Sequence, residues 1–179
     1  MKHPTRWVAS GVAVVVVILA IVLASQVHSD PRAEERTNAL TGHTVPAFAL
    51  KTLDGTALSK RTLSNKAVIV NFWNTWCIPC EQEFPALRTF YSRHATDPDF
   101  EMVGIVRDDT AAAVRDFVAA KQVGWKIAMD PGLDAVLAFG VRGQPETFAI
   151  SPDGTIVDFQ YGPSSIGRLE QMLSEARAA

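Results

Sequence analysis

One Cys-x-x-Cys motif contains both cysteines of the 179-residue chain, Cys77 and Cys80. Residues 67–73, just upstream, are rich in β-branched side chains and contain no glycine or proline, which predicts a buried strand. Residues 81–94, just downstream, carry large apolar side chains three or four positions apart, which predicts an amphipathic helix. We therefore expect the motif where a strand leads into a helix, and this junction constrains the possible folds more than any other stretch.

The expected position of the motif suits redox chemistry. Pro79 fits the first turn of a helix, because the N–H group that proline lacks would have no partner there. Free backbone N–H groups and the positive end of the helix dipole stabilise a thiolate at such a start. We assign Cys77 as the exposed nucleophile and Cys80, one turn further on, as the cysteine that closes the disulfide and releases a bound partner. Such a pair needs no cofactor beyond its own redox-active disulfide.

Two other uses of the cysteines remain open. A zinc site needs about four ligands, and the histidines that could complete one are His3, His28, His43 and His94. None of them has the spacing of a zinc finger, so no metal is expected. A purely structural disulfide would close a loop of two residues and would constrain the unfolded chain very little. The residues favour redox chemistry over both alternatives.

Strand and helix patterns continue to the C-terminus. Two hairpins are also expected, because Asp54-Gly55 and Asp153-Gly154 each lie between two short apolar runs. The further expected elements are helices at 110–121, 133–139 and 166–178, strands at 100–106 and 125–129, and hairpin strands at 46–50, 56–58, 147–150 and 156–160. This order predicts the α/β class, with a central mixed β-sheet covered by helices on both faces.

The N-terminal part of the chain differs from the rest in composition. Residues 7–24 form an apolar run of 18 residues, which as a helix would reach about 27 Å, close to the thickness of a bilayer's hydrocarbon core. A retained transmembrane anchor over residues 1–27 is favoured over a cleaved secretory signal, whose apolar region is usually shorter. Lys2 and Arg6 precede the run, so the rest of the chain is expected outside the cytoplasmic membrane, in the periplasm or its equivalent.

The remaining residues divide into a polar tether at 28–41 and one domain at 42–179. Two of the 17 basic residues precede the apolar run, which leaves 15 Lys and Arg against 19 Asp and Glu. An acidic domain without a basic patch does not favour nucleic acid as a partner. The tether would let the domain stand away from the membrane.

Three segments of the sequence resemble one known family. Residues 71–80, Asn-Phe-Trp-Asn-Thr-Trp-Cys-Ile-Pro-Cys, resemble the active-site segment of the thioredoxin superfamily. Glu-Phe-Pro at 83–85 and Gly-Gln-Pro-Glu-Thr-Phe at 143–148 resemble the membrane-anchored TlpA/ResA/DsbE (CcmG) branch. The resemblance covers most of the chain and implies a thioredoxin-like fold with an added N-terminal β-hairpin. Peroxiredoxins share that hairpin, but their Pro-x-x-x-Thr-x-x-Cys pattern is not met, because Val70 and Asn74 replace its proline and threonine.

The resemblance assigns substrate binding to Trp76, Gln144 and Pro145. On its own, Pro145 is read as a turn proline, since cis bonds occur at only about 5–6% of X–Pro positions. The family places a cis proline here beside the Cys-x-x-Cys motif, so we expect a cis Gln144–Pro145 bond. Residue 144 would then present backbone N–H and C=O groups to which a substrate peptide can add as a strand. We expect Trp73 and Trp76 to be packing residues, with Trp76 shielding the sulfurs.

Two glutamates are candidates for tuning the redox pair. Glu83 follows Cys80 by one helical turn, where a glutamate can equally lie on a solvated face. In ResA-type relatives a glutamate at this place tunes the cysteines, because a nearby carboxylate disfavours thiolates and can relay a proton. Glu146 is expected in the same vicinity. Asn71 stands where thioredoxin carries a buried aspartate, so that acid cannot be the proton acceptor in this chain.

Together these residues predict thiol–disulfide exchange outside the cytoplasmic membrane, through a mixed disulfide at Cys77 that Cys80 resolves. The resemblance favours a reductant that keeps the haem-binding cysteines of apocytochrome c reduced and receives electrons from a membrane thiol donor of the CcdA/DsbD type. Two alternatives stay open: a disulfide-forming oxidase for exported proteins, and a non-catalytic binding module for a metal or an apoprotein.

Overall fold

The computed structural model describes residues 15–19 and 38–179. Residues 15–19 are helical, and the second range holds the strands and helices of the folded domain. Within these two ranges no helix combines the length and the apolar character that a membrane span requires. Most of the predicted anchor at 1–27 and of the predicted tether at 28–41 lies outside the described residues.

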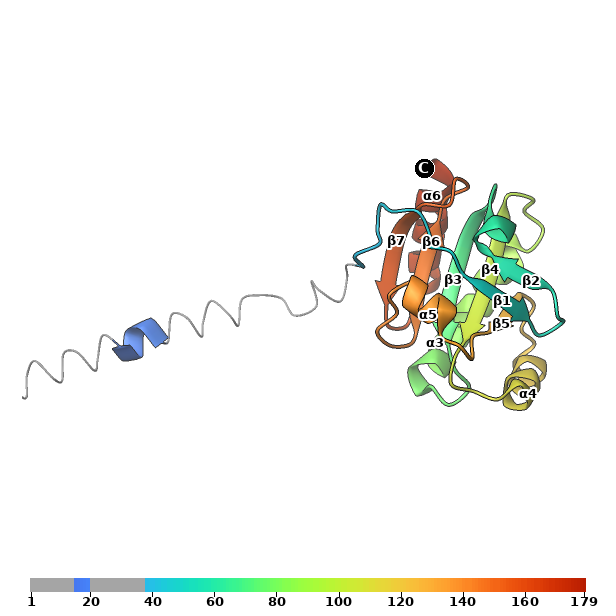
Figure 1. Cartoon of the computed structure of the whole chain (residues 1–179), viewed down its shortest axis with the longest axis horizontal. Coiled ribbons are helices and arrows are strands. Elements are labelled where there is room, and N and C mark those ends of the chain that lie inside the picture. The colour runs from blue at the N-terminus through green and yellow to red at the C-terminus, as the bar shows by residue number, and fades with distance from the viewer. Residues whose placement is uncertain (1–14, 20–37) are drawn as a thin grey trace, which may run out of the picture. The chain divides into compact units, whose positions relative to one another are not determined.

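The folded domain is built on a seven-stranded mixed sheet in the order β2-β1-β5-β4-β3-β6-β7 (Figure 1). The parallel part consists of β3, β4 and β5, and the other neighbouring pairs are antiparallel. The strands are β1 (Ala49–Thr52), β2 (Ala57–Ser59), β3 (Ala67–Trp73), β4 (Phe100–Val106), β5 (Lys126–Met129), β6 (Glu146–Ile150) and β7 (Ile156–Tyr161). The predicted α/β class with a mixed sheet and an added N-terminal hairpin is confirmed.

Helices cover both faces of this sheet. The helical elements are the 3-10 helix η1 (Lys60–Leu63) and the α-helices α3 (Ile78–His94), α4 (Ala111–Lys121), α5 (Asp134–Ala138) and α6 (Ile166–Ala178). Apolar side chains of α3, α4 and α6 share one core with one face of the sheet. Those of α5 and η1 share a second core with the other face. Cys77 and Cys80 belong to the core on the α3 face.

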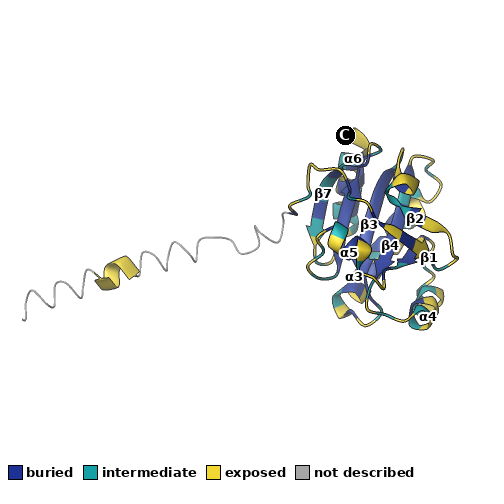
Figure 2. Cartoon of the chain, in the orientation of Figure 1, coloured by how far each residue is buried: buried dark blue, intermediate teal, exposed yellow. Residues whose placement is uncertain are grey.

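The central strand β3 is buried at all seven positions, and Figure 2 shows the middle of the sheet in the colour of buried residues. A strand covered on both faces is expected to read as a continuous apolar run rather than as an alternating one, as residues 67–73 do. Asn71 is the polar exception in this strand and is fully buried. A buried amide needs hydrogen-bond partners, so its position in the strand marks a polar cluster inside the core.

The helix after the motif buries one face, which carries Cys80, Glu83, Phe84, Leu87 and Phe90. The three apolar members contribute about 1.5–3 kcal/mol each through burial, which is what fixes α3 on the sheet. Glu83 lies within the same apolar stripe. The helical periodicity that orders the core therefore also places a carboxyl group inside it.

The structure differs from the sequence-based expectation at the N-terminal edge of the domain. The strand expected at 46–50 begins at Ala49 and ends at Thr52, because the Thr52 N–H donates to the Thr56 carbonyl and the hairpin closes there. Asn38, in the stretch expected to be a tether, is buried and its side-chain amide donates to the Phe139 carbonyl at 3.1 Å. The packed domain thus includes residues before position 42.

Candidate active site

The Cys-x-x-Cys motif lies at the junction between β3 and α3, as the sequence predicted. Cys77 is the N-cap residue of α3 and Pro79 follows within its first turn. The Cys80 N–H group donates to Cys77 Sγ at 3.2 Å, and the Glu81 N–H group donates to the Cys77 carbonyl at 3.0 Å. The first of these hydrogen bonds places a backbone donor on the sulfur, which stabilises a thiolate there.

The two cysteines form a disulfide with an S–S distance of 2.01 Å and a Cα–Cα distance of 5.2 Å. Cys80 is completely buried, whereas Cys77 retains 5% of its accessible surface. Cys77 is the more accessible of the two cysteines, as predicted, but it is buried, so the expectation of an exposed nucleophile is wrong.

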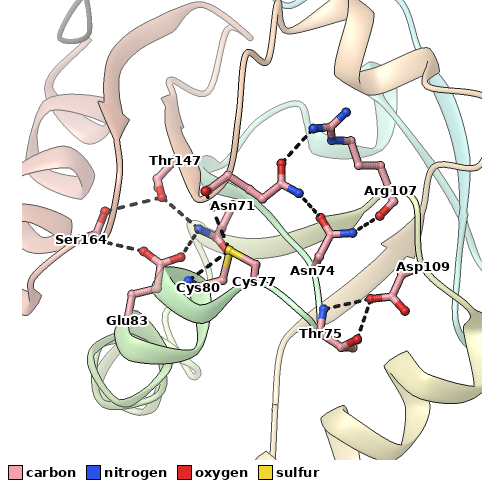
Figure 3. Close-up of a disulfide and its surroundings, with 11 residues drawn as sticks. Asn71, Asn74, Thr75, Cys77, Cys80, Glu83, Arg107, Asp109, Thr147 and Ser164 are labelled. Carbon is pink, nitrogen blue, oxygen red and sulfur yellow. Dashed lines mark hydrogen bonds between the residues drawn. A yellow bond between two sulfur atoms is a disulfide. The ribbon is translucent and has the colours of Figure 1, made fainter.

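Trp76 does not pack as the sequence analysis expected. Its side chain is 60% exposed, and its indole N–H donates to the Asp108 carbonyl at 3.1 Å. The neighbouring Thr75 donates from both its N–H and its hydroxyl group to Asp109 Oδ2, at 2.9 and 2.8 Å (Figure 3). These contacts tie the loop before Cys77 to the loop after β4 and leave the Trp76 ring at the surface. Trp73, in contrast, is buried as expected.

The Gln144–Pro145 peptide bond is cis, as predicted from the resemblance. The Gln144 carbonyl oxygen lies 3.8 Å from Cys77 Sγ, so the structure brings two of the three predicted binding residues, Gln144 and Pro145, next to the predicted nucleophile. The Pro145 carbonyl accepts a hydrogen bond from the Gly162 N–H at 2.9 Å. The chain at residue 144 is therefore the backbone edge next to the reactive sulfur.

Glu83 is the centre of the polar cluster on the α3 face, and its side chain is only 2% exposed. One carboxyl oxygen accepts from the Asn71 side-chain amide at 2.8 Å and the other from the Ser164 N–H at 2.9 Å (Figure 3). The Asn71 amide also donates to the Thr147 hydroxyl at 3.0 Å. Burial raises the pKa of Glu83 to about 7, although the hydrogen bonds from Ser164 and Asn71 act to lower it. The alternative of a solvated glutamate is wrong.

Glu146 lies on the opposite face of the sheet, which corrects its expected position beside the cysteines. It is paired with Phe72 across β6 and β3, and Phe72 and Phe148 belong to the core on the α5 face. Side chains alternate along a strand, so Thr147 and Ala149 point to the cysteine face, whereas Glu146 and Phe148 point away from it. One Glu146 carboxyl oxygen accepts from the N–H groups of Arg142 and Gly143, at 2.9 and 3.0 Å. Burial also raises the pKa of Glu146, against these two hydrogen bonds.

Sequence reasoning missed several residues that support the site. Thr147 and Ser164 join the Glu83 cluster, and Arg107 and Asp109 join the loops beside the motif. The position of the residues after β4 beside the motif could have been predicted, because neighbouring parallel strands end at the same edge of a sheet. Trp73 and Val106 are paired at that edge. Among the described residues no three metal-ligating side chains gather to hold an ion.

Comparison with known proteins agrees with this geometry. The model of the AhpC/TSA family matches residues 41–159. The thiol-disulfide oxidoreductase ResA of Halalkalibacterium halodurans is 30% identical over 175 residues, which is 97% of this chain and 94% of that protein. The ResA protein of Bacillus subtilis is 32% identical over 121 residues, which is 68% of this chain and 67% of that protein.

Solved structures support the same relationship to thiol–disulfide exchange proteins. A thioredoxin-family thiol:disulfide interchange protein from Chlorobium tepidum has a TM-score of 0.67 and 27% identity, over 74% of this chain and 94% of that one. The structure of MTB DsbF in its mixed oxidized and reduced forms has a TM-score of 0.67 and 28% identity, over 75% of this chain and 100% of that one. Fold, redox pair and relatives agree: the chain belongs to the AhpC/TSA family, within its TlpA/ResA/DsbE-like group of thiol–disulfide oxidoreductases.

Proposed function

We propose that this oxidoreductase works as a reductant outside the cytoplasmic membrane, held there by an N-terminal anchor. Its clients are the disulfides of exported proteins, with the haem-binding Cys-x-x-Cys-His segments of apocytochrome c as the favoured class. A membrane thiol donor of the CcdA/DsbD type returns the pair to the dithiol form, and no cofactor other than the Cys77–Cys80 disulfide is needed. The observation that carries the reducing direction is the burial of Glu83 one helical turn after Cys80.

The exchange proceeds by two displacements at sulfur. In the dithiol form, the Cys77 thiolate attacks one sulfur of the client disulfide, and the other client sulfur leaves as a thiolate that takes up a proton. Cys80 then loses its proton and attacks Cys77 Sγ, which releases the second client thiol and leaves the protein oxidised. Two electrons pass to the client, and the two protons that it gains match those lost by the pair. The Cys80 N–H group that donates to Cys77 Sγ supports the first attack.

Glu83 is suited to the second displacement. Cys80 is buried and must give up its proton where water does not reach it. A carboxyl group with a pKa of about 7 is close to half protonated at neutral pH, so it can both accept and return a proton. Its negative form also disfavours thiolates nearby, which destabilises the dithiol form and lowers the reduction potential. The proton transfer speeds exchange in either direction, and the lower potential favours a protein that donates electrons.

One observation favours the opposite direction. The hydrogen bond from the Cys80 N–H to Cys77 Sγ at the helix start stabilises the thiolate of the dithiol form. That feature alone would make the pair an oxidant, as in the strongly oxidising periplasmic proteins with potentials near −120 mV. A disulfide-forming oxidase is therefore the second candidate, and the balance between helix start and carboxylate decides between them.

Equilibration with glutathione tests the direction. We expect a reduction potential closer to the value of about −270 mV found for thioredoxin than to −120 mV. A potential near the oxidising value would replace the reductant proposal by the oxidase.

Client trapping tests the substrate class. A Cys80→Ser variant should hold a client through a mixed disulfide at Cys77, and a Cys77→Ser variant serves as the matched control that holds none. Recovery of apocytochrome c from the first variant alone is the expected result. Recovery of other exported proteins without apocytochrome c would leave the reductant in place and reject this client.

A further inference from the structure

Three side chains from three different loops form a closed ring of hydrogen bonds beside Cys77. Arg107 Nη2 donates to Gln144 Oε1 at 2.9 Å, and Gln144 Nε2 donates to Asn74 Oδ1 at 2.6 Å. The Asn74 amide then donates to the carbonyl oxygen of Arg107 itself, which closes the ring. The members follow β3, follow β4 and precede β6, and Figure 3 shows Asn74 and Arg107 joined through this path.

The ring can run in only one direction. A guanidinium group has donors and no acceptor, so the side-chain oxygen of Gln144 must face Arg107. A carbonyl group only accepts, so the amide nitrogen of Asn74 must face the Arg107 backbone. These two ends leave Gln144 Nε2 opposite Asn74 Oδ1, which is the arrangement observed. Each amide therefore has a single orientation, and Arg107 determines both of them.

The ring holds the residue whose backbone lies against the reactive sulfur. The Gln144 carbonyl oxygen is 3.8 Å from Cys77 Sγ, and Asn74, three residues before Cys77, is buried. When the side chain of a residue is hydrogen-bonded to two partners, the backbone of that residue has less conformational freedom. Arg107 itself is half-buried, with 26% of its side chain exposed, and also approaches Asp108 at 3.6 Å.

We propose that Arg107 is a positioning residue for exchange with peptide disulfides. Through the ring it fixes Gln144 relative to Asn74, and so aligns the backbone edge at residue 144 with Cys77 while a client segment adds along that edge. A disulfide without peptide groups does not use the edge and does not depend on Arg107. The inference rests on the proposed use of residue 144 by clients, and it names a residue that touches neither sulfur nor client.

The test compares two probes on the dithiol form of the full chain. One is a synthetic peptide with an oxidised Cys-x-x-Cys-His segment, and the other is bis(2-hydroxyethyl) disulfide, which has no peptide group. Arg107→Met should lower the second-order rate constant for the peptide about tenfold, equivalent to about 1.4 kcal/mol, and change that for the small disulfide less than twofold. Gln144→Met breaks the ring from the other side and should give the same pattern.

Two further variants make the test specific. The double variant Arg107→Met/Gln144→Met should be no slower with the peptide than either single variant, because all three lack the same ring. Lys121→Met is the charge control: 41% of the Lys121 side chain is exposed, it pairs with Glu81 in the first turn of α3, and its loss also removes one positive charge near the motif. Both probes should react with this control at the parent's rates. Gln144→Met also decides the question if Arg107→Met does not fold.

The contrary outcomes separate this inference from the proposed function. If the parent prefers the peptide and Arg107→Met and Gln144→Met keep that preference, the ring does not position the edge and the inference is rejected alone. Equal slowing of both probes would mean that Arg107 acts through its charge on the thiolate, which also rejects it. If the parent shows no preference for the peptide, the client edge at residue 144 is rejected together with the inference.

Discussion

Two buried glutamates, Glu83 and Glu146, lie on opposite faces of the same sheet. Comparing them shows that burial of a carboxyl group does not by itself link it to the redox pair. Burial raises the pKa of both, and each accepts two hydrogen bonds from N–H groups. Glu83 lies in the helix that carries Cys80 and shares its core, whereas Glu146 binds the backbone of the loop before Pro145. A raised pKa therefore marks both residues, but only the position of Glu83 links it to redox chemistry.

The largest expected effect is a pH dependence of stability that Glu83 confers. The folded-state pKa of about 7 lies above the ordinary value of 4.5, so the folded protein binds more protons than the unfolded chain between these values. The stabilisation is complete below pH 4.5 and is lost as the pH rises through about 7. Urea unfolding of the oxidised protein should show that the parent loses about 3 kcal/mol across this window relative to Glu83→Gln. Parallel pH profiles would mean that Glu83 does not hold this proton.

The next largest expected effect is a loss of stability through the loop that precedes Pro145. Replacement of Glu146 by alanine removes the shared acceptor of the Arg142 and Gly143 N–H groups, and we expect a loss of about 2 kcal/mol of unfolding free energy. Glu146→Gln keeps one acceptor oxygen and should cost less. Denaturant unfolding at constant pH measures both. An alanine variant as stable as the parent would show that the loop does not need this carboxylate.

A smaller effect should appear when Glu83 loses one partner. Asn71 donates to the Glu83 carboxyl group and thereby lowers its pKa. Asn71→Leu removes the donor and leaves the burial, so the pKa of Glu83 should rise above about 7, by about one unit. Carbon-detected NMR titration of the glutamate side chains measures this, with Glu146 as the internal control that should not move. A downward shift of the Glu83 pKa would contradict the assigned partners.

The contrast between the two glutamates also shows how far the sequence could lead. The largely apolar runs at 67–73 and 100–106 predicted β3 and β4 with their observed bounds. Glu83 falls on the buried stripe of α3, so helical spacing could have indicated its burial, which the sequence-based prediction left open. Glu146 was grouped with the cysteines because it follows Pro145. The alternation of side chains along a strand, with Phe148 on the same face, was the stronger signal.

Other features were beyond sequence reasoning for a physical reason. The adjacent ends of the parallel strands β3 and β4 could be predicted, but the ring of Asn74, Arg107 and Gln144 also needs the loop before β6, and the register of β6 on β3 is set by the whole sheet rather than by any local pattern. Ser164 reaches Glu83 from a position 81 residues further along the chain. Trp76 was misjudged because large aromatic residues are usually packed, whereas its indole N–H bonds to Asp108 and keeps the ring at the surface.

The most direct test of the central claim is the reduction potential of the Cys77–Cys80 pair in three proteins, the parent, Glu83→Gln and Glu146→Gln, equilibrated with glutathione. Removing the Glu83 charge should favour the thiolate at Cys77, which titration of thiolate absorbance follows, and should make the potential less negative, by up to roughly 30 mV for each unit of thiol pKa. Glu146→Gln should leave the potential at the parent's value. An unchanged potential in Glu83→Gln, or an equal shift in both variants, would contradict the assignment of redox tuning to Glu83.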